Sequence, residues 1–206
     1  DVWSPVPPSI EAAREGATLI VNCSASDETI GKDLYRRSLI EGQSARLICG
    51  YIYANAGEGE STTDLVFGGH NLIAENGTVL KASRRFVNGA IYSEIDLDRL
   101  LSERRKNTTF KAMEDPVLWR IPFEVRIEET KLTREISSRP FVPEHAKDRA
   151  VRCEEILMIQ AMGLKKRLAH AHAKNAVVGI SGGLDSTLAL LVSAKAFDML
   201  GLDRKG

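Results

Sequence analysis

The stretch Val177-Val-Gly-Ile-Ser-Gly-Gly-Leu-Asp-Ser186 decides the fold class. The apolar run Ala176 to Ile180 predicts a buried strand, and Ser181 to Gly183 predicts a tight turn. Leu184 to Leu200 follows as a predicted helix, which Gly201 closes. A strand, a glycine turn and a helix in this order form the opening of an α/β domain. The sequence therefore predicts an α/β fold.

The turn has the parts of a site for a polyphosphate. Gly182 and Gly183 have no Cβ atom, so their backbone N–H groups can approach a ligand closely. The helix that follows directs its free N–H groups and the positive end of its dipole to the same point. Ser181 and Ser186 add hydroxyl groups, and Asp185 would face a phosphate mainly through a divalent cation. The alternative is an ordinary helix N-cap.

We therefore expect this loop to bind a pyrophosphate group, and Asp185 to hold Mg²⁺ through the phosphates. The loop lacks the Walker pattern and is not GxGxxG. It resembles the SGGxDS loop of the ATP pyrophosphatases, which cut ATP between its α and β phosphates. The expected ATP contacts are Gly179, Ile180, Ser181, Gly182, Gly183, Leu184, Asp185 and Ser186.

The chain upstream alternates predicted helices and short strands. Helices are expected over Ile10 to Glu15, Asp33 to Cys49, Leu97 to Lys106 and Asp148 to Lys174. Strands are expected over Ala17 to Val21, Tyr51 to Ala54, Leu65 to Phe67, Asn71 to Ala74, Val79 to Ser83 and Ile91 to Ile95. Asn107 to Pro143 reads as an irregular connector with a short strand around Phe123 to Ile127. The predicted domains are residues 1–110 and 147–206, joined by residues 111–146.

Several upstream motifs carry a family resemblance. They are Trp3-Ser-Pro-Val-Pro-Pro-Ser9, Val21-Asn-Cys-Ser-Ala-Ser26, Thr29-Ile-Gly31, Ala56-Gly-Glu-Gly-Glu-Ser-Thr-Thr-Asp64, Glu75-Asn-Gly77 and Ser138-Arg-Pro-Phe-Val-Pro143. With the SGGLDS loop, they resemble the glutamine-dependent NAD⁺ synthetases. The resemblance implies the C-terminal part of a nitrilase-like α-β-β-α sandwich. The start of an adenine-nucleotide α-hydrolase-like (Rossmann-like) α/β domain would follow it.

The resemblance also implies two coupled reactions. A nitrilase-type glutaminase, a carbon–nitrogen hydrolase, releases ammonia from glutamine. ATP then adenylates deamido-NAD, and the ammonia displaces AMP to give NAD⁺. The family nucleophile lies in a Cys-Glu-Asp sequence whose Asp matches Asp1. We therefore expect a partial chain without a catalytic residue, its Cys lying two residues before Asp1. Homo-oligomers are expected from the same resemblance.

The resemblance assigns glutamine contacts to Ser26 and Lys32. The family usually has Arg at position 32, and Lys loses the two-pronged fork of a guanidinium. The alternative for Ser26 is an ordinary serine in a turn. The alternative for Lys32 is a solvated charge at the start of a helix. Trp3 either lines the pocket or is a core aromatic residue. The acidic loop from Glu58 to Asp64 either orders the glutaminase site or is simply solvated.

Composition limits the remaining function classes. The formal net charge of the 206-residue chain is zero, so the chain has no general attraction for nucleic acid or an anionic membrane. Cys23, Cys49 and Cys153 are scattered, which predicts a reducing cytoplasm and structural, inert thiols at Cys23 and Cys49. Glu103 to Lys106 reads as a solvated helix face. The rival functions are a carbon–nitrogen hydrolase without ATP, another amidotransferase of the ATP-pyrophosphatase class, and a non-catalytic nucleotide-binding module.

Overall fold

The computed structural model describes residues 1–60, 63–113, 117–126, 128–129, 131–143 and 145–205. The chain separates into two compact units, Asp1–Glu135 and Ile136–Gly206. The boundary between them lies inside the segment predicted as a connector. Helices and a mixed sheet together confirm the predicted α/β class.

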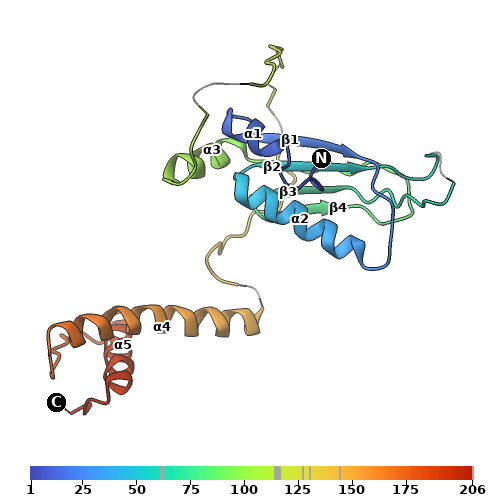
Figure 1. The fold of residues 1–206 in the computed structure, drawn as a ribbon. Coiled ribbons are helices and arrows are strands. Elements are labelled where there is room, and N and C mark those ends of the chain that lie inside the picture. Colours follow the sequence, from blue (N-terminus) through green and yellow to red (C-terminus); the bar gives the residue numbers. More distant parts are fainter. Residues whose placement is uncertain (61–62, 114–116, 127, 130, 144, 206) are drawn as a thin grey trace. The chain divides into compact units, whose positions relative to one another are not determined.

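The first unit contains a four-stranded sheet in the order β1-β2-β3-β4 (Figure 1). Its strands are β1 (Leu19–Ser24), β2 (Gly50–Asn55), β3 (Leu72–Glu75) and β4 (Thr78–Ala82). β1 and β2 are parallel, whereas β3 pairs antiparallel with both β2 and β4. The β3–β4 turn has positive φ at Asn76 (44°) and Gly77 (86°), which suits a tight hairpin. The motif Glu75-Asn-Gly77 therefore forms the turn between the strands predicted over Asn71 to Ala74 and Val79 to Ser83.

Helix α2 (Lys32–Leu47) packs against β2, β3 and β4. Its buried residues recur at helical spacing and are Arg36, Ile40, Gln43, Ser44 and Leu47. Ile40 and Leu47 join Tyr51, Tyr53 and Leu72 in the main apolar core. Leu34 and Ala45 are apolar yet exposed, because the buried face of the helix is centred on Arg36 and Ile40.

Two shorter helices, α1 (Ser9–Arg14) and α3 (Leu97–Lys106), complete the first unit. Arg104 of α3 is buried and donates to four backbone carbonyls, those of Ala13, Ala17, Leu47 and Ile48. These carbonyls lie at the end of α1, just before β1, and at the end of α2. The prediction of a solvated face over Glu103 to Lys106 is thus wrong for Arg104, whose guanidinium is buried against these carbonyls.

The second unit contains α4 (Ala146–His170) and α5 (Leu184–Leu200), which pack on each other. Leu168, Ala196 and Phe197 form their shared core. α5 has the predicted bounds, and Gly201 closes it at φ 66°. In the described part of the chain, no helix is long and apolar enough to cross a membrane.

Four predicted strands are absent from the described residues. Residues 91–95, 123–126 and 176–180 make no strand, and residues 65–67 contribute only a single bridge between Phe67 and Asp27. Ile127 lies outside the described residues. Residues 176–180 are also largely exposed, with Val177 fully so. A strand needs a neighbour for its N–H and C=O groups, and no neighbouring strand accompanies these segments in the described structure. The helix predicted over Asp33 to Cys49 ends at Leu47, and Gly50 begins β2.

Candidate functional site

The loop before α5 is shaped by glycine and by its own hydroxyl groups. Gly182 has a φ of +84°, which favours glycine over other residues. The backbone N–H of Gly183 points to the Ser181 hydroxyl at 3.4 Å. Ser186 and Thr187 each donate a hydroxyl hydrogen bond to the Gly183 carbonyl, at 3.1 and 2.9 Å. The Ser181 and Ser186 oxygens are 3.3 Å apart. The predicted turn therefore brings both hydroxyl groups together at the start of α5.

The surface of this loop is open. A Cβ atom at Gly179 or Gly182 would meet no heavy atom within 4 Å, and at Gly183 only the Ser181 hydroxyl at 3.5 Å. Leu184 is 90% exposed, and Ile180 and Asp185 are exposed as well. The loop can therefore present backbone N–H groups and the helix N-terminus to an anion without rearrangement.

Asp185 lies in the first turn of α5. Among the described residues, no group of three or more His, Cys, Asp and Glu side chains could hold a metal ion. Mg²⁺ usually takes one or two carboxylates and completes its shell with phosphate oxygens and water. A single carboxylate beside a phosphate-binding turn is such a donor set.

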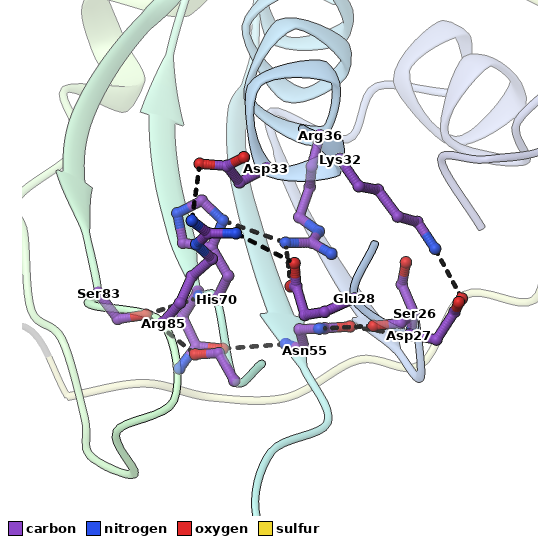
Figure 2. Close-up of polar contacts among 12 residues, drawn as sticks. Ser26, Asp27, Glu28, Lys32, Asp33, Arg36, Asn55, His70, Ser83 and Arg85 are labelled. Atoms are coloured by element: carbon purple, nitrogen blue, oxygen red, sulfur yellow. Dashed lines mark hydrogen bonds and ion pairs between the residues drawn. The ribbon is translucent and has the colours of Figure 1, made fainter. Parts of the chain in front are cut away.

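In the first unit, Ser26 is buried just after β1 and is held by Asn55. The Ser26 N–H donates to Oδ1 of Asn55 at 2.9 Å, and Nδ2 of Asn55 donates back to the Ser26 carbonyl at 3.0 Å. The Asn55 N–H in turn donates to Asn71 at 2.9 Å, and the Asn71 N–H donates to the Ser83 hydroxyl at 2.8 Å. Figure 2 labels Ser26, Asn55 and Ser83 among these residues. The backbone of Ser26 is therefore fixed by side chains from β2 and beyond.

Lys32 begins α2 and faces the same region. Its Nζ is 2.6 Å from Oδ1 of Asp27 and lies 5.1 Å from the centre of the Trp3 ring. The hydrogen bond from Lys32 holds the pKa of Asp27 below its usual value. An open pocket of about 400 Å³ is lined by Trp3, Ser26, Asp27 and Lys32, among others. The structure thus brings the two predicted glutamine contacts to one pocket.

Trp3 fits both alternatives that the sequence left open. Its ring lines the pocket and also packs against the apolar core. Its indole N–H donates to the Tyr53 hydroxyl at 3.1 Å. Cys23 lines the same pocket and is exposed. Cys23, expected to be a structural thiol in the interior, is exposed because the buried side of β1 carries Ile20 and Asn22.

Behind this pocket lies a charged cluster that the sequence analysis missed. The Arg36 and Glu28 side chains are 0% and 5% exposed and approach to 2.6 Å. Nδ1 of His70 is 3.2 Å from Nη1 of Arg36. Arg85 lies 3.6 Å from Glu28 and 3.6 Å from Asp33 (Figure 2). A signal for Arg36 was present, since it lies at helical spacing from Ile40, Gln43 and Leu47 on the buried face of α2.

The remaining candidates are two cysteines and the acidic loop. Cys49 is buried as predicted, and burial raises the pKa of its thiol to about 11. Cys153 is exposed in α4. In the acidic loop, Glu58, Glu60 and Asp64 are exposed, while Ser61 and Thr62 lie outside the described residues.

Comparison with known proteins gives matches that include both of these regions of the sequence. Residues 156–204 match the model of the NAD synthase family. Over 99% of its length the chain is 42% identical to a glutamine-dependent NAD(+) synthetase of Mycobacterium leprae, of which it covers 32%. The predicted resemblance is confirmed. A relative of the same description from Mycobacterium tuberculosis is 41% identical over 99% of the chain.

The chain spans about a third of the length of these curated relatives. A solved glutamine-dependent NAD(+) synthetase from Cytophaga hutchinsonii aligns with 35% of this chain and 12% of its own, at 37% identity and a TM-score of 0.34. The sequence match to the curated relatives extends over both units of the chain.

Proposed function

We propose that this chain is part of an enzyme that makes NAD⁺ from deamido-NAD and ATP, with glutamine as the nitrogen donor. The observation that carries the proposal is the turn before α5. There Gly182, Gly183 and two serine hydroxyl groups meet at an open helix N-terminus. The 42% identity to a glutamine-dependent NAD(+) synthetase along 99% of the chain supports the same reaction.

In this proposal the loop binds the pyrophosphate part of ATP. The chain has no net charge to attract a polyanion, so the attraction must come from local N–H groups, the helix dipole and the two hydroxyls. Asp185 would hold Mg²⁺ against the phosphates. Bound ATP would supply the adenylyl group that activates the carboxylate of deamido-NAD.

The first unit contributes the glutamine contacts. Ser26 and Lys32 border one pocket, and the ammonium of Lys32 suits the α-carboxylate of an amino acid. The ammonia released from glutamine would then serve the reaction at the ATP loop. Keeping it away from bulk water matters, because most ammonia is protonated at neutral pH and ammonium is no nucleophile.

The test is ATP–pyrophosphate exchange in the full-length protein carrying Gly183→Val. Gly183 has φ −80° and ψ 169°, which a valine can adopt, so the variant should fold. Its side chain would fill the space where backbone and phosphate should nearly touch. We expect exchange to be abolished, along with NAD⁺ synthesis from either glutamine or ammonia, while glutamine hydrolysis stays measurable.

Gly163→Ala is the matched control. Gly163 is an exposed glycine inside α4, and a Cβ there would meet no heavy atom within 4 Å. This variant should keep the exchange rate of the natural protein. Normal exchange in Gly183→Val would reduce the turn to a helix cap. It would favour the carbon–nitrogen hydrolase that works without ATP.

A further inference from the structure

We infer that Asp27 binds the α-ammonium group of glutamine while Lys32 binds its α-carboxylate. The two side chains would together select a free, zwitterionic amino acid. The inference rests on the proposed function and gives the pocket beside Trp3 a defined ligand class. It adds a specificity-determining residue, Asp27, to the two contacts expected from the sequence.

The pair is arranged to accept both charges of an amino acid at once. Nζ of Lys32 contacts Oδ1 of Asp27 at 2.6 Å. An ammonium group has three N–H donors and a carboxylate has two oxygens, so each group keeps capacity for a ligand while the bond persists. The Asp27 side chain is 36% exposed and the Lys32 side chain 19%. Both line the open pocket, and Figure 2 shows them facing each other apart from the buried cluster.

The backbone on both sides of Asp27 is fixed, so its carboxylate is held in place. Ser26 exchanges two hydrogen bonds with Asn55. The Glu28 N–H donates to the Val66 carbonyl at 2.7 Å, and Asp27 itself forms a bridge with Phe67. A group held by such neighbours loses little conformational entropy when a ligand binds.

The charge balance of the pocket also favours a zwitterion. Asp27 and Lys32 together are neutral, so a ligand with one charge of each sign leaves every group paired. Asp1 is the other carboxylate at the pocket. Its Oδ1 accepts from the Trp3 N–H at 3.3 Å and from the Ser24 hydroxyl at 3.5 Å. Asp27 is the carboxylate in contact with Lys32, and it is therefore the better placed to receive the ammonium beside the carboxylate.

The experiment compares two substrates in the full-length protein carrying Asp27→Asn. One is glutamine, and the other is 4-carbamoylbutanoate, which keeps the amide and the carboxylate but has no α-ammonium group. Ammonia release gives kcat/KM for each. We expect kcat/KM for glutamine to fall about 10-fold, the size of one charge-assisted hydrogen bond at a partly exposed site. The value for the analogue should hardly change, so the preference for glutamine shrinks by the same factor.

The control is Asp33→Asn, which removes a negative charge from the same end of α2. Asp33 lies near Arg85 and does not line the pocket, so the substrate preference should stay as in the natural protein. An equal loss with both substrates in Asp27→Asn would make Asp27 merely structural. A gain with glutamine would mean that Asp27 competes with the substrate for Lys32. Either result overturns the inference. The proposed function itself is tested separately. It would be overturned if the unmodified full-length protein failed to make NAD⁺ with glutamine as the nitrogen donor.

Discussion

The two candidate regions are held in place by different means. Around Ser26 and Lys32, side chains from several strands and α2 fix the backbone and form a buried charged cluster. The loop at 179–186 is shaped by contacts among its own residues and by one positive φ angle, at Gly182. The first region therefore depends on long-range packing, whereas the second is encoded within a few consecutive residues.

This difference has a consequence for what mutations do. A change inside the first region can disturb the fold and the ligand contacts together, so stability and function must be measured separately. A change on the open loop can remove ligand contacts while α4 and α5 keep their packing. The following predictions test that contrast, beginning with the largest expected effect.

Arg36→Met should destabilise the first unit strongly. The change leaves the buried Glu28 carboxylate without its nearest cation, and breaking a buried ion pair from one side costs about 3–5 kcal/mol. Arg85, 3.6 Å from Glu28, can offset part of this loss. Urea unfolding followed by the fluorescence of Trp3 and Trp119, both of the first unit, measures the change.

The neighbouring Arg37→Met provides the control. Arg37 pairs with Glu41 at 3.0 Å on the exposed side of α2, and such pairs contribute only about 0.3–0.5 kcal/mol. The double variant Arg36→Met, Glu28→Gln should recover part of the lost stability, because no uncompensated charge is left buried. Equal effects of Arg36→Met and Arg37→Met would contradict a structural role for the cluster.

The same contrast explains which features the sequence could predict. The bounds of α3 and α5 follow from local signals such as apolar periodicity, a closing glycine and a capping Asp96, whose side chain accepts from the Arg99 N–H. The β3–β4 hairpin follows from Asn76 and Gly77. These elements are stabilised by residues close together in the sequence, so the local sequence is enough to predict them.

The strands that were predicted but do not form lack a pairing partner, and the local sequence pattern does not reveal whether a partner is present. Residues 91–95 alternate like a strand, yet they form no strand ahead of α3, and Glu94 instead accepts hydrogen bonds from Thr133 and Arg134. The burial of Arg104 is likewise decided by carbonyls up to 91 positions away along the chain. A run of charged residues predicts solvent exposure. The burial of one arginine within such a run can therefore be recognised only from the tertiary structure.

Lys32→Ala should raise the KM for glutamine by about 10- to 150-fold, the loss of one charge-assisted contact of roughly 1.5–3 kcal/mol. NAD⁺ synthesis from ammonia should stay nearly intact, because the ATP loop lies in the other unit. Steady-state kinetics of the full-length protein with each nitrogen donor measures both values. Arg37→Ala, which removes an exposed cation from the same helix, should leave both unchanged. A normal glutamine KM in Lys32→Ala would remove Lys32 from the site.

The smallest expected effect is a pH dependence that originates in the first unit. His70 is buried, and this burial holds its pKa below the usual value, with the Arg36 guanidinium acting in the same direction. The folded chain therefore binds this proton less readily than the unfolded chain does. The contribution of neutral His70 to stability is complete above its unfolded pKa of about 6.5 and is lost as the pH falls toward the lower folded value.

We therefore expect the free energy of unfolding to decrease as the pH falls from about 7 to 5, where most carboxylates stay ionised. His70→Gln cannot take up this proton, so its curve should be flatter in that window. His145→Gln, at an exposed position before α4, should keep the slope of the natural protein. Urea unfolding at a series of pH values gives the free energy of unfolding of the natural protein and of both variants as a function of pH. Parallel curves for the natural protein and His70→Gln would show that the charged cluster tolerates a protonated His70. The first region would then be less dependent on its buried charges than the geometry implies.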